Sequence, residues 1–266
     1  MEQLILYKKT GGFKMDLRIN GKNVLVVGAS KGIGKGIALG FAEEGARVTT
    51  IARSEELLME LNTEMKELVD TDHAYYVSDI MEDDANQLAR KIIEERGIFD
   101  VVVHNVGGSL VSRNALGTLE EWQHAWKFNA GVAIDMNNVL VQPMIDKGWG
   151  RVIHVSSISA KMLRGNPLYA SAKAFLNAYV TTVGRTIAPT GVVMSAVMPG
   201  AVAFPGSYWD KFTVTDPARC EDFLSHHQAA NRFGTPKEIA DVVLFMASEQ
   251  ASFMHSALVP VDGANM

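Results

Sequence analysis

The stretch NVLVVGASKGIGKGIALGFAEEG, residues 23–45, starts as an apolar, β-branched run and continues through a glycine-rich turn into a helical pattern. Its glycines Gly28, Gly32 and Gly34 have the spacing G-x-x-x-G-x-G where the strand ends and the helix begins. Glycine allows a tight turn and lets backbone N–H groups approach a pyrophosphate at the positive N-terminus of the helix. The alternative is a glycine-rich turn that binds nothing. Because the turn lies in the first strand–helix unit, we predict a dinucleotide-binding site there.

Short apolar runs alternate with helical patterns along the rest of the chain. The predicted strands are 23–28, 47–52, 74–79, 100–104, 151–157, 192–198 and 257–261. The predicted helices are 31–44, 54–69, 84–96, 118–147, 168–188 and 236–247, the fourth opened by a Thr118–Glu121 capping box. Because the strands are almost continuously apolar, helices should cover both faces of a parallel sheet. The sequence therefore predicts an α/β fold, a Rossmann-type doubly wound parallel sheet of about seven strands.

The chain has the organisation of a single domain over residues 15–266, without repeats, low-complexity tracts or a linker. Residues 1–14 resemble an N-terminal extension or an expression remnant, because Met15 is a possible natural start. The longest irregular stretch is 199–235, and a loop of that length in a compact domain is usually functional. We therefore expect a substrate lid at about 201–232. It carries four aromatic residues whose alternative role is ordinary packing: Phe204, Tyr208, Trp209 and Phe212.

Composition and charge argue against several classes of function. The 266 residues have a net charge of −5 and a pI of about 5.8, which gives no basic footprint for nucleic acid. No apolar run approaches the roughly 20 residues needed to cross a bilayer, so we expect no membrane partner and a cytoplasmic location. The single cysteine, Cys220, excludes an internal disulfide and fits a reducing compartment. Because Cys220 and the pair His226-His227 lack companion ligands, we predict no metal site and place the histidines in a solvated loop.

The end of the second predicted strand bears on the kind of dinucleotide. An NAD-specific site places an acidic residue there for the ribose 2′-hydroxyl, whereas this chain has Ala52, Arg53 and Ser54. Lys31 adds a second cation inside the glycine turn. Two cations and a hydroxyl suit a 2′-phosphate, which an acid would repel. The sequence therefore predicts NADP(H) as the cofactor; the alternative is that both cations are solvated surface residues.

A second motif contains residues that can exchange a proton. The stretch NPLYASAKAF, residues 166–175, places Tyr169 and Lys173 four residues apart on one face of a predicted helix. A free tyrosine has a pKa near ~10, and a nearby cation lowers it by about 1–3 units. We therefore expect Lys173 to lower the pKa of Tyr169, so that Tyr169 exchanges a proton at neutral pH. The alternative is a chance pair on a helix surface.

Taken together, the motifs resemble the short-chain dehydrogenase/reductase family over residues 17–266, in particular its NADP-preferring branch related to the 3-oxoacyl-acyl-carrier-protein reductases. The matching residues are Gly28-Ala-Ser-Lys-Gly-Ile-Gly34, Asp79-Ile80, Asn105-Val-Gly107, Asn129, Ser156-Ser157, Tyr169-x-x-x-Lys173 and Pro199-Gly200, followed by RFGTPKEIADVVLFMASEQASF and VPVDG. One departure is His104-Asn105-Val106-Gly107-Gly108, where the family commonly has Asn-Asn-Ala-Gly. We expect His104 to be a core histidine.

The resemblance implies a role for each matched residue. Tyr169 would exchange the proton, Ser157 would polarise the substrate carbonyl, and Lys173 would also bond the nicotinamide ribose. Ser156 is the competing serine, but neighbours at a strand end point to opposite faces, so we choose Ser157. Asn129 would bind a water that leads protons toward Lys173; the alternative is a satisfied buried amide.

The resemblance also implies the cofactor site, in which Asp79 would bond the adenine and Ile80 would pack against it. The implied cofactor-binding residues are Gly28, Ser30, Lys31, Gly32, Ile33, Gly34, Arg53, Ser54, Asp79, Ile80, Asn105, Gly107, Tyr169, Lys173, Pro199, Gly200 and Val202.

The function implied is an NADP(H)-dependent oxidoreductase that transfers a hydride between nicotinamide and a ketone or secondary alcohol. A 3-oxoacyl-carrier-protein reductase and a non-catalytic dinucleotide-binding sensor are the alternatives. Carrier-protein reductases present cations beside the active site, where this chain has Leu116, Thr118 and Thr190. We therefore expect a small polar or sugar-like substrate. The resemblance further implies a homo-oligomer, with a tetramer favoured, built on the predicted helices 118–147 and 168–188.

Overall fold

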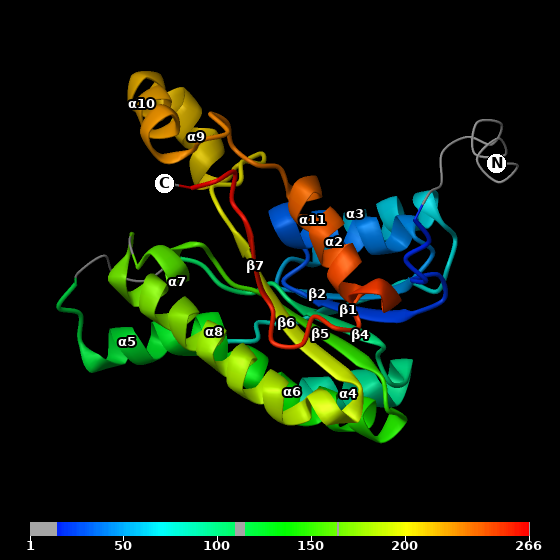
Figure 1. The fold of residues 1–266 in the computed structure, drawn as a ribbon. Coiled ribbons are helices and arrows are strands. Elements are labelled where there is room, and N and C mark those ends of the chain that lie inside the picture. Colours follow the sequence, from blue (N-terminus) through cyan, green and yellow to red (C-terminus); the bar gives the residue numbers. More distant parts are fainter. Residues whose placement is uncertain (1–14, 110–114, 164, 266) are drawn as a thin grey trace, which may run out of the picture.

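A parallel sheet forms the centre of the molecule (Figure 1). The computed structural model describes residues 15–109, 115–163 and 165–265, so the prediction for residues 1–14 lies outside the described residues. Within these ranges one sheet has seven parallel strands in the order β3-β2-β1-β4-β5-β6-β7. The strands are β1 (Asn23–Val27), β2 (Arg47–Ala52), β3 (Ala74–Val77), β4 (Val101–His104), β5 (Gly150–Val155), β6 (Val192–Pro199) and β7 (Leu258–Val261). The predicted α/β fold is therefore confirmed.

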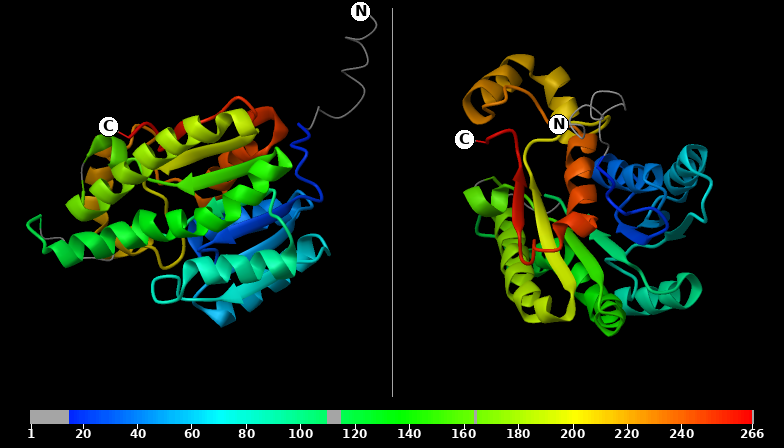
Figure 2. Two further views of the ribbon diagram at one scale, coloured as in Figure 1. Left: turned by 90° about the horizontal axis from the view of Figure 1, so that it is seen from below. Right: turned by 45° about the vertical axis from the view of Figure 1, so that its right-hand side comes forward.

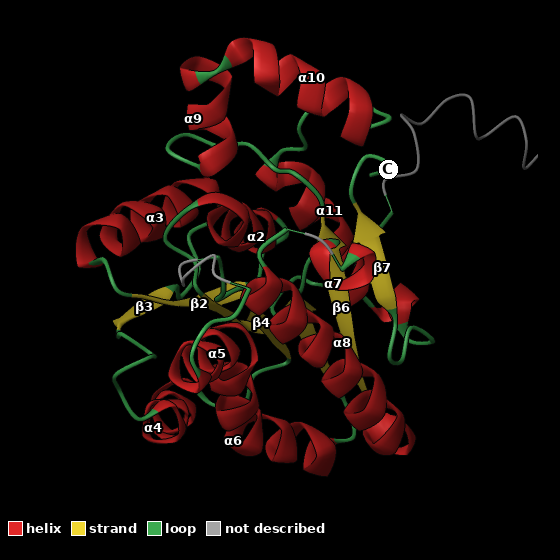
Figure 3. Ribbon diagram, turned by 90° about the vertical axis from the view of Figure 1, so that its left-hand side faces the viewer, coloured by secondary structure: helices red, strands yellow, loops and turns green. Residues whose placement is uncertain are grey.

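Helices cover both faces of this sheet (Figure 3). One face carries α2 (Gly32–Glu43), α3 (Glu55–Leu68) and α11 (Pro236–Ala247), and the other carries α4 (Ala85–Arg96), α6 (Val132–Lys147) and α8 (Pro167–Ile187). Along β1, Val24 and Val26 pack toward the α2 and α11 layer, whereas Leu25 and Val27 pack into the opposite layer. Burial on both faces explains why the strands are continuously apolar. No helix in the described ranges is both long and apolar enough to cross a membrane.

The predicted helix 118–147 is present but not uniform. It consists of α5 (Leu119–Trp126), a π-helical turn at Lys127–Gly131, and α6. The predicted capping box opens α5, because Thr118 accepts from the Glu121 backbone N–H and Glu121 accepts from the Thr118 backbone N–H. A further helix, α7 (Ser159–Met162), has only four residues and is too short to produce a helical period in the sequence.

The prediction that residues 199–235 are irregular is wrong. They contain α9 (Tyr208–Thr215) and α10 (Pro217–His227). Both helices begin at side-chain caps, with Ser207 accepting from the Asp210 N–H and Asp216 accepting from the Arg219 N–H. His226 and His227 therefore end a helix and do not lie in a loop. Among the described residues, no group of three or more His, Cys, Asp or Glu side chains could hold a metal ion.

Helices α9 and α10 stand apart from the layers, beyond the end of β6 (Figures 1 and 2). No side chain of α9 is buried, and Cys220 is the only buried one in α10. The two helices pack on each other through aromatic rings, with Trp209 and Phe223 stacked at a centroid distance of 4.7 Å. This segment therefore has a small aromatic core of its own and few buried contacts with the rest of the protein.

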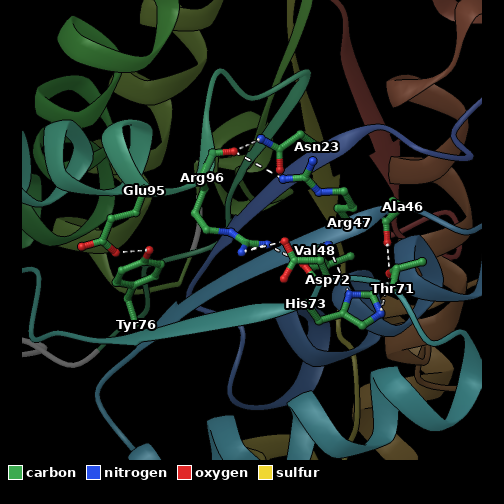
Figure 4. Close-up of polar contacts among 10 residues, drawn as sticks. All are labelled: Asn23, Ala46, Arg47, Val48, Thr71, Asp72, His73, Tyr76, Glu95 and Arg96. Atoms are coloured by element: carbon green, nitrogen blue, oxygen red, sulfur yellow. Dashed lines mark hydrogen bonds and ion pairs between the residues drawn. The ribbon is translucent and has the colours of Figure 1, made fainter.

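The opposite end of the sheet, at the amino ends of its strands, is held by a polar network (Figure 4). Arg96, the last residue of α4, pairs with Asp72 at 2.9 Å, and its carbonyl oxygen accepts from Asn23 Nδ2 at 3.0 Å. Close by, the backbone N–H of Val48 donates to Nδ1 of the buried His73 at 3.2 Å. These bonds join α4, β1, β2 and the segment before β3, so this end of the sheet is fixed.

A second buried polar network lies between the sheet and helices α6 and α8. His104 Nε2 lies 2.8 Å from Asn137 Oδ1, and Asn137 Nδ2 lies 3.3 Å from His154 Nε2 and 3.1 Å from the Tyr179 hydroxyl. The two imidazole rings stack with centroids 4.9 Å apart. Burial lowers the pKa of His104 to about 4 and that of His154 well below its ordinary value, so both rings are neutral at pH 7. The prediction that His104 is a core histidine is confirmed.

These neutral histidines should make the protein sensitive to acid. A histidine in the unfolded chain has a pKa near 6.5, whereas the pKa of folded His104 is about 4. Because the unfolded chain takes up the proton first, this stability is fully present above about pH 6.5 and is lost as the pH falls toward 4. For His104 alone, the free energy of unfolding should fall by on the order of 2 kcal/mol between pH 7 and pH 5, as measured by urea titration.

The variant His104→Leu isolates this effect. It should be less stable than the wild type at pH 7, because Asn137 loses a partner, yet its stability should depend less on pH. An equal pH dependence in variant and wild type would contradict a neutral His104.

Candidate active site

A cavity of about 670 Å³ opens at the carboxyl ends of β1, β2 and β4. This is where the strand order reverses between β1 and β4, the place at which open parallel sheets bind their ligands. Its lining residues are Gly28, Ser30, Lys31, Ile33, Ile51, Ala52, Arg53, Ser54, Leu57, Ser78, Ile80, Asn105, Val106, Gly107, Phe128 and Phe204.

The glycine turn forms one wall of the cavity and fits a dinucleotide. A Cβ on Gly34 would lie 2.1 Å from the Gly28 carbonyl oxygen and 2.5 Å from Asn105 Nδ2, so only glycine allows this close packing. Asn105 Nδ2 in turn donates to the Gly28 carbonyl at 2.7 Å and fixes the turn against the end of β4. Helix α2 starts at Gly32 beside the cavity, and no side chain caps its first N–H groups. A pyrophosphate suits these free donors and the positive helix terminus.

Two cations line the cavity, one in the glycine turn and one directly after β2. Lys31 and Arg53 both line it, together with the Ser54 hydroxyl. The Arg53 guanidinium is largely exposed and lies 3.7 Å from an Asp79 carboxylate oxygen. The pair therefore leaves Arg53 free to contact a ligand, since a surface ion pair of this length is weak.

Most of the predicted cofactor residues come together here, but some do not. Those that line the cavity are Gly28, Ser30, Lys31, Ile33, Arg53, Ser54, Ile80, Asn105 and Gly107. Ser78 and Ile80, the neighbours of Asp79, line the cavity, whereas Asp79 is not among the lining residues; its carboxylate accepts from the Met81 N–H and lies 3.7 Å from Arg53.

Other predicted cofactor-binding residues do not line the cavity but lie in the segments around it. Gly34 is packed against Gly28, and Gly32 lies under the Phe204 ring. Gly200 donates its N–H to Val261, and Val202 is buried beside Gly234. The Pro199 carbonyl accepts from the Ile158 N–H at 3.0 Å, which ties the end of β6 to the segment that carries Ser157.

A second group of polar side chains lies beside the cavity. Tyr169 from α8 forms a hydrogen bond with Ser157, which follows β5. The competing Ser156 donates to Asn177 Oδ1 at 2.6 Å and points elsewhere, so the choice of Ser157 agrees with the geometry. Lys173, one turn after Tyr169 in α8, is buried and donates from Nζ to the Val155 carbonyl at 2.9 Å.

The expected direction of the Tyr169 pKa is wrong in this structure. Burial raises the pKa of Tyr169, and the hydrogen bond with Ser157 opposes the rise. Lys173 does not offset the burial, because it is itself buried and its own pKa is lowered to about 7. At neutral pH Lys173 is therefore only partly charged, and Tyr169 keeps its proton. A protonated phenol in this position can donate to a carbonyl oxygen.

Asn129 lies in the π-helical turn between α5 and α6, a type of turn that is frequent at functional sites. Its side chain is buried and holds the loop after β4. Oδ1 accepts from the Gly108 N–H at 2.9 Å, while Nδ2 donates to the carbonyl oxygens of Ala125 at 3.0 Å and Gly108 at 3.2 Å. The amide thus makes three hydrogen bonds, two with Gly108 and one with Ala125. Its predicted contact with a water stays a prediction.

The cavity and the polar group meet at Gly107. This residue lines the cavity, and a Cβ added to it would lie 2.7 Å from both Asn129 Oδ1 and Lys173 Nζ. The site can therefore hold a dinucleotide within reach of a hydroxyl, a phenol and an amine.

Several lining residues are absent from the predicted cofactor-binding residues, namely Ile51, Ala52, Leu57, Ser78, Val106, Phe128 and Phe204. Most are apolar, and an apolar residue in or beside a strand or helix has no signal that separates a cavity wall from the core. Ser78 was detectable in principle, since it lies in the third predicted strand directly before Asp79, the last residue of that strand.

Comparisons with known proteins agree with this geometry. A family model described as enoyl-(acyl carrier protein) reductase matches residues 28–264. A 3-oxoacyl-acyl-carrier-protein reductase of Thermotoga maritima is 30% identical over 253 residues, covering 93% of this chain and 98% of its own length. A glucose 1-dehydrogenase of Gluconobacter oxydans is 32% identical over 250 residues, covering 92% of each chain.

Among solved structures, L-sorbose reductase from Gluconobacter frateurii, complexed with NADPH and L-sorbose, superposes with a TM-score of 0.86. It is 27% identical, and the match covers 94% of this chain and 98% of that one. The fold, the glycine turn, the Ser157–Tyr169–Lys173 group and these matches agree: the chain belongs to the short-chain dehydrogenase/reductase family.

Proposed function

We propose that the protein is an NADP(H)-dependent oxidoreductase that transfers a hydride between nicotinamide and a ketone or secondary alcohol. The observation that carries the proposal is the position of Gly107, which lines the dinucleotide cavity and where an added Cβ would lie 2.7 Å from Lys173 Nζ and Asn129 Oδ1. The family and the NADPH complex of L-sorbose reductase support the same reaction class. The expected cytoplasmic location is part of this proposal.

The residues of the chain would handle the proton and the substrate oxygen. The nicotinamide supplies or accepts the hydride when it is bound. Ser157 donates a hydrogen bond to the carbonyl oxygen, and Tyr169 gives that oxygen its proton. Lys173, whose pKa is lowered to about 7 by burial, exchanges protons readily at neutral pH and can restore the proton of Tyr169.

The non-catalytic sensor is the alternative of another class. A sensor needs the cavity but has no use for a phenol, a hydroxyl and an amine placed together. The Ser157–Tyr169 hydrogen bond and the burial of Lys173 therefore favour an enzyme.

The variant Tyr169→Phe tests the proton transfer. Turnover should fall by at least about 100-fold, because the hydroxyl is lost, while NADPH binding stays near the wild-type value. Lys173→Met should reduce both the turnover and the binding of NADPH. The matched control is Tyr179→Phe in the same helix, which removes a hydroxyl bonded only to Asn137 in the described contacts and should keep most of the activity. Tyr169→Phe with more than a few per cent of wild-type turnover would contradict the role.

The cofactor preference would rest on Lys31 and Arg53. Arg53→Ala should raise the KM for NADPH about tenfold and leave the KM for NADH nearly unchanged, because only NADPH carries the 2′-phosphate. Ala52→Asp should shift the preference toward NADH by repelling that phosphate. The control is Lys35→Ala, a cation paired with Glu64 at 2.7 Å outside the cavity. Equal wild-type efficiency with both cofactors would refute the assignment.

We further propose a small polar or sugar-like substrate. The lid cations Lys211, Arg219 and Arg232 are accompanied in the sequence by Asp210, Asp216, Glu221 and Asp222. Arg232 forms a two-point ion pair with Glu238 at 2.6 and 3.1 Å, and the net charge of the chain is −5. Long-range attraction for an acidic carrier protein would therefore be weak. Glucose 1-dehydrogenase and L-sorbose reductase are relatives that act on sugars, whereas the carrier-protein reductases keep the alternative open.

A substrate panel tests the proposed function. NADPH oxidation should be measured with free keto-sugars, with small ketones and with an acyl-carrier-linked 3-ketone, and the reverse reaction with polyols. We expect the highest kcat/KM on a free hydroxylated substrate. A high kcat/KM on the carrier-linked substrate alone would contradict the sugar-like substrate and support the alternative, a 3-oxoacyl-carrier-protein reductase.

A homo-oligomer, with a tetramer favoured, is the last part of the proposal. Trp126 of α5 and Phe175 of α8 lie edge to face at 5.8 Å and leave 41% and 44% of their surfaces exposed. A second copy of this helix pair would cover them. Sedimentation should give about four times 29.0 kDa. Trp126→Glu should lower the mass measured by sedimentation, whereas the control Met59→Glu on α3 should leave it unchanged. A wild-type species of 29.0 kDa would refute the proposal.

A further inference from the structure

Alternate residues of β5 face the two helix layers of the protein. Val152 packs in the layer of α6 and α8, whereas Ile153 and Val155 pack in the layer of α2 and α11. His154 therefore faces α6 and α8, and its side chain is completely buried there. It precedes Ser157 by three residues and has no part in the proton transfer proposed above. A buried imidazole in the strand that leads to Ser157 is a candidate for a further role.

Lys173 reaches the same stretch of β5 from α8. Its Nζ donates to the carbonyl oxygen of Val155, the residue after His154, at 2.9 Å. This is the one hydrogen bond of the amine among the described residues, although an ammonium has three N–H donors. Gly107 lies so close that an added Cβ would be 2.7 Å from Nζ. The amine is therefore tightly packed with few bonds, and its charge depends on the polarity of the side chains around it.

Three contacts hold the ring of His154. The ring of His104 stacks on it with centroids 4.9 Å apart, and the ring of Tyr179 packs edge to face at 5.8 Å. His154 Nε2 lies 3.3 Å from Asn137 Nδ2. The imidazole is therefore kept in one orientation.

The second nitrogen of this ring, Nδ1, is buried and forms no hydrogen bond among the described residues. Asn137 uses only Nε2, so the bonding capacity of Nδ1 is spare. Buried polar atoms are nearly always bonded, which makes a spare ring nitrogen a feature that requires an explanation. Its polarity is available to the charge of Lys173, which acts on this ring.

Few charges act on these two basic groups. Burial is the main cause of the lowered pKa of His154, followed by the charges of His104 from β4 and Lys173 from α8. Burial raises the pKa of Tyr169 and of Tyr179 in α8, so both phenols stay uncharged at neutral pH, and α6 contributes an amide to this layer. Among the described residues of the layer, Lys173 is thus the group that takes up a proton near pH 7.

We propose that His154 is a positioning residue for Lys173: its uncharged ring is the polar wall that lets the buried amine hold a proton at neutral pH. The imidazole dipole stabilises the ammonium, whereas an apolar side chain in its place would leave the charge without that support. The proposal rests on the proposed function, in which Lys173 restores the proton of Tyr169. It adds that the proton affinity of Lys173 is set from β5, by a residue that does not line the cofactor cavity.

The matched variants are His154→Leu and His154→Met, which fill the space with an apolar side chain, and His154→Asn, which keeps a polar one. The titration of Lys173 is measured in the free protein by NMR of carbon-13-labelled lysine, and its signal is identified by its loss in Lys173→Met. The wild-type midpoint should lie near pH 7, since burial lowers the pKa of Lys173 to about 7. In both apolar variants the midpoint should fall by about 0.5–1 unit, and in His154→Asn it should stay within about 0.3 unit.

The pH profile of kcat for ketone reduction gives a second readout. Protonated Lys173 is the form that restores the proton of Tyr169, so kcat should decline above the pKa of Lys173. In His154→Leu this decline should begin about 0.5–1 unit lower, which is a loss of about three- to tenfold at pH 8 and little loss at pH 6. A purely structural defect would instead lower kcat by the same factor at every pH.

The control Tyr179→Phe removes a hydroxyl from the same buried layer but keeps the ring that packs on His154. It should keep the wild-type midpoint and pH profile. An unchanged Lys173 midpoint in both apolar variants would overturn the role of His154, whatever happens to turnover. A wild type without turnover would overturn the proposed function and the link to catalysis, but the titration would still decide whether His154 sets the charge of Lys173.

Discussion

The close approach of the loop after β4 to helix α8 is the constraint on which the site depends. At Gly107 a side chain would be crowded, because Lys173 Nζ and Asn129 Oδ1 each lie 2.7 Å from the position that a Cβ would take. The strand brings Gly107 to the edge of the dinucleotide cavity, and the two helices bring the polar groups from the opposite layer. Widening this contact would separate the cavity from the residues proposed to handle the proton.

Burial of an amine at this point requires that nearby charge be kept low. Lys173 has one acceptor, the Val155 carbonyl, and no carboxylate partner in the described contacts. The histidines behind it are neutral, and repulsion from Lys173 is one cause of the lowered pKa of His154. The His104–Asn137–His154 network near Lys173 is therefore neutral and adds no positive charge. The pKa of Lys173 near 7 follows from burial in these surroundings.

Much of the fold could be predicted because the strands and long helices have clear patterns. The glycine turn and the Tyr169–Lys173 pair were equally visible, since their chemistry needs particular residue types at fixed spacing. The predicted direction of the Tyr169 pKa failed because spacing shows that an amine is near but not that both groups are buried. The sequence placed Phe204 among the aromatic residues of the predicted lid, but its contact with Gly32, far away in the sequence, could not be predicted. Helices α9 and α10 were missed although their caps are local signals.

The molecule has a firmly held base, formed by the sheet and its covering helices, and a more loosely attached segment formed by α9 and α10. Polar bonds hold the amino ends of the strands, so the carboxyl ends present the turn, Gly107 and Ser157 on a rigid base. Helices α9 and α10 bury one side chain among them, Cys220, and keep a core of their own rings, while backbone bonds from Ala229 and Ala230 tie the end of α10 to the segment after β7. Segments with few buried contacts open at low free energy and can change without unfolding the rest. The proposed role of this segment as a substrate lid would let relatives with the same base differ in their substrates, as the names of the carrier-protein reductase and the glucose 1-dehydrogenase do.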